Sequence, residues 1–126
     1  MQIRAYLKQE IALKQIETAL GIFFAQGDLF SVITLAAAAE EILAQLPGGG
    51  PAGIKRAFTS IFEILRIKRN RDHDRHFNFE DEELVHMDPY QDAVFLLGRA
   101  IDEYQQVSGT LTPDMLRFNT SVRTPE

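Results

Sequence analysis

The most constraining feature of the sequence is an apolar stripe that follows Asp28. Its residues recur at steps of three and four, as along one face of an α-helix: Leu29, Val32, Ala36, Ala39, Leu43 and Leu46. Only two charged residues, Glu40 and Glu41, interrupt the sequence from this point to Lys55. The alanines would let neighbouring helices approach closely. The stripe therefore predicts a central helix that starts after Asp28 as its N-cap.

Glu40 and Glu41 place two carboxylates beside this stripe. Carboxylates near a core can serve catalysis or bind a metal ion. Glutamate is rarely fully buried, however. We therefore expect both side chains to lie at the edge of the stripe and to reach solvent.

Further helices are predicted on either side. Residues 3–25 place Leu13, Ile16, Leu20 and Phe23 on one face, and residues 54–68 repeat the helical spacing. Another helix starts with Asp88 as N-cap, Pro89 at the first position and Gln91 in capping-box position. It runs to about Val107, and its stripe is Tyr90, Val94, Leu97, Ile101 and Tyr104.

A short last helix is predicted from Thr112-Pro113-Asp114, with Met115, Leu116 and Phe118 covering one end of the bundle. The tail, residues 119–126, is expected to fray. Residues 46–53 form a glycine- and proline-rich connection without the ending of a phosphate-binding loop. The prediction is an all-α single domain over residues 1–126: four main helices in an up-and-down bundle with a short fifth C-terminal helix.

Composition limits the classes of function. The 126 residues include no cysteine, which excludes disulfides, thiolate metal sites and thiol nucleophiles. No apolar run approaches the roughly 20 residues that cross a bilayer, and the N-terminal residues are too charged for a secretory signal. We expect a cytoplasmic protein without membrane contact. The net charge of -5 argues against general coating of nucleic acid, although a local basic patch can still bind phosphate.

Such a patch lies at residues 66–76, where five of the 13 basic residues and two of the three histidines gather. Cations at a helix C-terminus are favoured by the helix dipole, so part of the cluster has a structural explanation. Four consecutive acidic residues follow at 80–83. Ion pairs between the basic and the acidic run across a surface loop would neutralise much of the remaining positive charge.

Metal binding is an alternative use of the histidines. Glu83 and His86 match the E-x-x-H spacing of di-iron bundles, but those sites need a second pair and further glutamates. His73 and His76 with nearby aspartates match no strong geometric template. We therefore predict no metal site and no cofactor.

The run Arg69-Asn70-Arg71-Asp72-His73-Asp74-Arg75-His76 resembles the R-x(4 to 6)-H motif of the HEPN family, small all-helical nucleotide-binding domains. Two registers fit, from Arg69 or from Arg71 to His76, each with a polar residue after the arginine. Many members of that family are metal-independent ribonucleases that act as dimers, some with a nucleotidyltransferase-like antitoxin.

The resemblance implies a HEPN-like bundle and a homodimer that binds RNA or a nucleotide, with a partner protein in some cases. The implied catalytic residues are Arg69 or Arg71 on phosphate and His76 as proton donor or acceptor. Asn70, Asp72 and His73 are the implied nucleotide-binding residues.

A second resemblance covers residues 27–43, which are similar to a group of uncharacterised small helical bacterial proteins. Members of that group often carry a Lys-His-Ala-Asp-like stretch, whereas Lys68 is followed here by Arg69. The resemblance implies a bacterial helical domain. Two classes of function remain open: a HEPN-like ribonuclease or nucleotide-binding protein, and a non-enzymatic module for dimerisation or partner binding.

Overall fold

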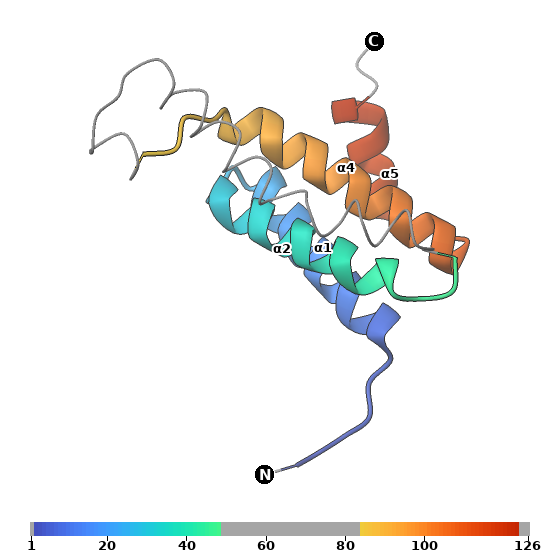
Figure 1. Cartoon of the computed structure of the whole chain (residues 1–126). Coiled ribbons are helices and arrows are strands. Elements are labelled where there is room, and N and C mark those ends of the chain that lie inside the picture. Colours follow the sequence, from blue (N-terminus) through green and yellow to red (C-terminus); the bar gives the residue numbers. More distant parts are fainter. Residues whose placement is uncertain (1, 49–83, 124–126) are drawn as a thin grey trace.

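The computed structural model describes residues 2–48 and 84–123 (Figure 1). Within these residues the chain is helical and contains no strand, which confirms the all-α prediction. None of the helices described is long and apolar enough to cross a membrane. The helix predicted over residues 54–68 lies outside the described residues. The elements are α1 (Lys8–Phe24), α2 (Leu29–Ala44), α4 (Pro89–Ser108), α5 (Pro113–Phe118) and a π-helical turn, η2 (Asn119–Arg123).

The first helix begins later than the sequence pattern predicted. α1 starts after Leu7, which provides no side-chain cap, and residues 2–7 form no regular structure. The prediction of helix from Ile3 was wrong because apolar spacing alone does not fix a helix start. The face predicted for α1 is largely correct, since Ile16, Leu20 and Phe23 are buried and Leu13 is half-buried.

The starts of α2 and α4 follow the predicted caps. The Asp28 carboxylate accepts a hydrogen bond from the Phe30 amide at 3.1 Å, and the Asp88 carboxylate accepts one from the Gln91 amide at 3.1 Å. Each bond satisfies one of the amides that a helix N-terminus leaves without an intrahelical partner. α4 ends at Gly109, whose φ of 80° is the left-handed conformation that glycine adopts without steric cost.

α2 and α4 run in the same direction, and α1 runs in the opposite one (Figure 1). The rings of Phe23 and Tyr90 lie 5.6 Å apart, which places the end of α1 beside the start of α4. A Cβ atom on Gly48 would lie 3.3 Å from the Gln106 carbonyl oxygen, so the C-terminal ends of α2 and α4 are neighbours. Gly48 therefore lies beside the end of α4, whereas residues 84–88 directly precede its start.

The core lies where α1, α2, α4 and α5 meet. Small side chains of α2, such as Ala36 and Ala39, are completely buried, as expected for close helix packing. The largest fully buried apolar side chains are Ile16, Leu20, Val32, Leu43, Leu96, Leu97, Ile101, Met115 and Phe118. The helices therefore share one contiguous apolar cluster.

The short helix α5 closes one side of this cluster. Thr112 caps it by accepting a hydrogen bond from the Met115 amide, and the same hydroxyl donates to the Glu17 carboxylate of α1 at 2.7 Å. Met115 and Phe118 are buried as predicted. Leu116 was expected to cover the bundle as well, but it lies on the outer face of α5 and is exposed.

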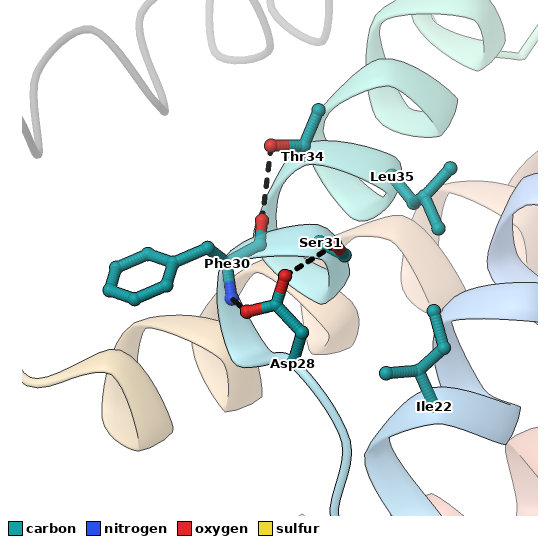
Figure 2. A pocket seen from close by; sticks show the side chains of 6 residues that line it. All are labelled: Ile22, Asp28, Phe30, Ser31, Thr34 and Leu35. Carbon is teal, nitrogen blue, oxygen red and sulfur yellow. Dashed lines mark hydrogen bonds between the residues drawn. The ribbon is translucent and has the colours of Figure 1, made fainter.

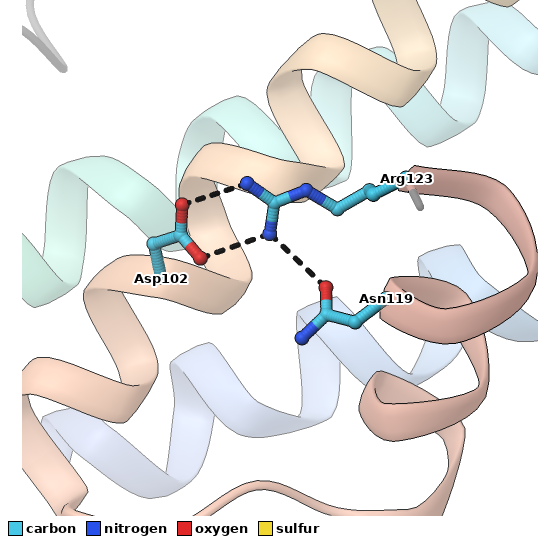
Figure 3. Close-up of polar contacts among 3 residues, drawn as sticks. All are labelled: Asp102, Asn119 and Arg123. Atoms are coloured by element: carbon cyan, nitrogen blue, oxygen red, sulfur yellow. Dashed lines mark hydrogen bonds and ion pairs between the residues drawn. The ribbon is translucent and has the colours of Figure 1, made fainter. Parts of the chain in front are cut away.

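Part of the predicted frayed tail is ordered, because Arg123 ties η2 to α4 (Figure 3). Its guanidinium donates to both carboxylate oxygens of Asp102 at 2.9 Å and to the side-chain oxygen of Asn119 at 3.0 Å. The hydrogen bonds to Asp102 raise the pKa of Arg123. Gly98 leaves room for this side chain, since a Cβ atom there would lie 2.9 Å from the Arg123 Nε atom.

Candidate functional site

The six residues that the HEPN resemblance selects lie outside the described residues. They are Arg69, Asn70, Arg71, Asp72, His73 and His76. The acidic run that would pair with them, residues 80–83, lies there too. The structure describes the helical layer on either side of this segment, from which three features bear on function.

The first feature is a buried ion pair between α2 and α4. Arg99 Nε donates to Glu40 Oε2 at 3.0 Å, and the Arg99 terminal nitrogen Nη2 lies 3.0 Å from the same oxygen. The side chain of Glu40 is 0% exposed and that of Arg99 is 16% exposed. The guanidinium also lies 5.4 Å from the centre of the Phe95 ring. The pair links α2 to α4 across 59 residues of sequence.

Sequence reasoning missed this pair. Glu41 is exposed as expected, but the expectation that Glu40 reaches solvent was wrong. Glu40 lies four residues after Ala36 and three before Leu43, so its position on the apolar stripe was a signal of burial. One turn beyond Arg99, Glu103 is also fully buried. The described core thus holds two buried carboxylates, those of Glu40 on α2 and Glu103 on α4.

The second feature concerns metal binding. His86 lies in the non-helical residues 84–88 and is exposed, so it does not project from a helical face as a di-iron ligand does. Across residues 2–48 and 84–123, no group of three or more side chains of the ligating types could hold a metal ion.

The third feature is an open groove of about 500 Å³ beside the turn between α1 and α2. Figure 2 shows its lining: Ile22, Asp28, Phe30, Ser31, Thr34 and Leu35. The Asp28 carboxylate accepts hydrogen bonds from the Phe30 amide and, at 2.7 Å, from the Ser31 hydroxyl. These bonds, that from Ser31 foremost, lower the pKa of Asp28. The Thr34 hydroxyl donates to the Phe30 carbonyl oxygen at 3.0 Å.

The groove therefore combines apolar walls with an ionised carboxylate. Both hydroxyl groups of its described lining, those of Ser31 and Thr34, donate hydrogen bonds to acceptors within the first turns of α2. Comparison of the chain with models of protein families, with curated proteins and with solved structures finds no match.

Proposed function

We propose that the chain is a HEPN-like helical bundle that binds RNA or a nucleotide and cleaves RNA without a metal ion. The observation that carries the proposal is the sequence run in which Arg69 and Arg71, each followed by a polar residue, precede His76 at the family's spacing. In this proposal the protein acts as a homodimer in the bacterial cytoplasm.

The described helices support the frame that this proposal needs. α2 and α4 run in the same direction (Figure 1), so the described residues after α2 end beside the end of α4, and the described residues resume before the start of α4. A helix over residues 54–68 would span about 22 Å and would return antiparallel to both. The resulting up-and-down bundle would carry the Arg/His run at the end of that helix, with α5 as the short fifth helix.

The chemistry follows from the residue types. A guanidinium fork from Arg69 or Arg71 holds and neutralises a phosphate through paired hydrogen bonds. The imidazole of His76 accepts or donates a proton near neutral pH. Asn70, Asp72 and His73 would orient the nucleotide and the imidazole. A second copy would double the local positive charge and attract a polyanion to an otherwise acidic protein.

Cleavage of single-stranded RNA oligonucleotides in the presence of a chelator tests the proposal. Wild-type protein should cleave, and His76→Ala should lower the rate by about 100-fold or more, because a positioned acid or base contributes that much. His86→Ala is the matched control, since His86 is an exposed histidine outside the motif, and it should retain the wild-type rate. Absence of cleavage by wild type, or equal rates in wild type and His76→Ala, would reject the ribonuclease.

Arg69→Ala and Arg71→Ala separate the two registers of the motif. Replacement of the arginine that holds phosphate should weaken RNA binding and cleavage, and replacement of the other arginine should not. Binding is measured at two salt concentrations, because loss of a phosphate contact also lowers the salt dependence. Equal behaviour of both variants and wild type would remove the arginines from the site.

A non-enzymatic module for dimerisation or partner binding is the second candidate. The observation in its favour is a set of exposed aromatic side chains at the starts of α2 and α4, namely Phe30, Tyr90 and Phe95. Exposed apolar side chains that gather on a surface mark sites of protein association. This candidate predicts self-association or partner binding that His76→Ala leaves unchanged, together with no RNA cleavage.

A further inference from the structure

α2 has a second buried side besides the one that faces the core. Ala37, Glu40 and Ala44 follow at steps of three and four, which places them on one side of the helix, and all three are buried. Neither alanine belongs to the apolar cluster that the described helices share. These three residues form the second face of α2.

The second face points away from α1. Leu35 and Ile22 of α1 line the same groove, so Leu35 lies on the side of α2 that is near α1 (Figure 2). Ala37 follows Leu35 by two residues, a rotation of about 200° around the helix. The second face therefore lies on the opposite side of α2.

α4 adds to this surface from its own far side. The Tyr90 ring lies 5.6 Å from the Phe23 ring of α1, which marks the side of α4 near α1. Arg99 follows Tyr90 by about two and a half turns, so it leaves α4 on the opposite side, where it pairs with Glu40. Glu103 lies one turn further on this side and is buried. α2 and α4 thus present one surface that is directed away from α1.

The chain between the two described parts has to pass along this layer. Gly48 lies beside the end of α4, and residues 84–88 precede its start. The 20 residues of α4 are about 30 Å long. Residues 49–83 therefore run back over this length, in the direction opposite to α2 and α4.

The sequence of this connection contains a helical apolar stripe in residues 54–68. Ile54 and Ile61 have the same seven-residue spacing as Ala37 and Ala44. In an antiparallel helix Ile54 would face Ala44 and Ile61 would face Ala37, so each large side chain would meet a small one. Small side chains let two helices approach closely.

Charge favours the same pairing. The segment carries four basic residues and one acidic residue, namely Lys55, Arg56, Arg66, Lys68 and Glu63. The surface of α2 and α4 carries the buried carboxylates of Glu40 and Glu103 and the guanidinium of Arg99. A positively charged segment is therefore complementary to this surface.

We propose that residues 54–68 dock as a helix on this surface, antiparallel to α2 and α4, with Ile61 over Ala37. α2 and α4 then form the middle layer between α1 and this helix. The inference deepens the bundle of the proposed function and rests on that bundle alone, because the Arg/His run begins after the helix ends. Absence of RNA cleavage would leave it standing, and failure of the packing would leave the ribonuclease to the cleavage assay.

Cross-linking tests the placement, because the sequence has no cysteine of its own. Ala37→Cys/Ile61→Cys should form a disulfide within one chain on mild oxidation, since the proposed register brings these Cα atoms within the roughly 7 Å that a disulfide needs. Thr18→Cys/Ile61→Cys is the matched control, because Thr18 is exposed on α1, and it should form at least about tenfold less disulfide in the same time. Absence of the disulfide between positions 37 and 61, or an equal yield from both pairs, would overturn the proposal.

Hydrogen exchange of the wild-type chain tests the same packing without a substitution. The backbone amides of residues 58–68 should exchange at least about 100-fold more slowly than in an unfolded peptide of the same sequence, because a docked helix exchanges only when it opens. Ala37→Arg should remove this protection while the amides of α1 and α4 stay protected, whereas Thr34→Arg, at an exposed position of α2, should keep it. Exchange of residues 58–68 at the peptide rate in wild type, or equal effects of the two arginine variants, would refute the docking.

Discussion

Replacement of Arg99 with methionine would leave the buried carboxylate of Glu40 without the guanidinium that contacts it at 3.0 Å. Removal of one member of a buried ion pair costs about 3–5 kcal/mol, mainly because the remaining charge is desolvated. Arg99 keeps 16% of its side-chain surface exposed, so we expect the lower end, about 3 kcal/mol. For a chain of this length that corresponds to a fall in Tm of about 12 °C.

Urea unfolding followed by circular dichroism measures this loss. The control is Arg117→Met, because Arg117 is exposed and its guanidinium lies 3.8 Å from the centre of the Phe24 ring, a contact worth about 0.5–1 kcal/mol. A double-mutant cycle with Glu40→Met isolates the coupling between the two charges. A loss no larger than that of the control, or additivity within about 0.5 kcal/mol, would refute the claim that this pair fixes α2 against α4.

Three further variants test local features of the fold. Gly109→Ala should destabilise the protein by about 1–2 kcal/mol because its φ of 80° is strained for alanine, whereas Gly21→Ala, in a regular helix, should stabilise it by up to about 1 kcal/mol. Urea midpoints that shift in the same direction would contradict this. Asp28→Asn should reduce the loss of stability in acid. The pKa of Asp28 is lower in the folded protein than in the unfolded chain, so its carboxylate stabilises the fold above the unfolded-state pKa, and this stabilisation is lost as pH falls through the folded-state pKa. Acid titrations with identical profiles would refute it.

Local signals in the sequence predicted much of the fold. Asp28, Asp88 and Thr112 each accept a hydrogen bond from an amide in the first turn of the helix that follows, so those helix starts could be located from residue type. The start of α1 could not, because Leu7 supplies no side-chain cap and the apolar side chains before Lys8 are exposed.

Long-range pairing accounts for what the sequence did not reveal. Glu40 is paired with Arg99, 59 residues later, and residues 119–123 are tied to α4 because Arg123 reaches back to Asp102. Neither contact follows from spacing within one helix. The Arg/His run was recognised from residue types alone, and it lies outside the described residues. The groove was missed because its lining comes from both α1 and the start of α2, and spacing within one helix does not show which residues meet across two.

The most direct test of the proposed function is the rate of RNA cleavage in chelator for wild type, His76→Ala and His86→Ala, measured on the same single-stranded substrate. The HEPN-like site predicts cleavage by wild type and by His86→Ala, and a rate lower by about 100-fold or more in His76→Ala. Equal rates in all three proteins, or no cleavage by wild type, would contradict it.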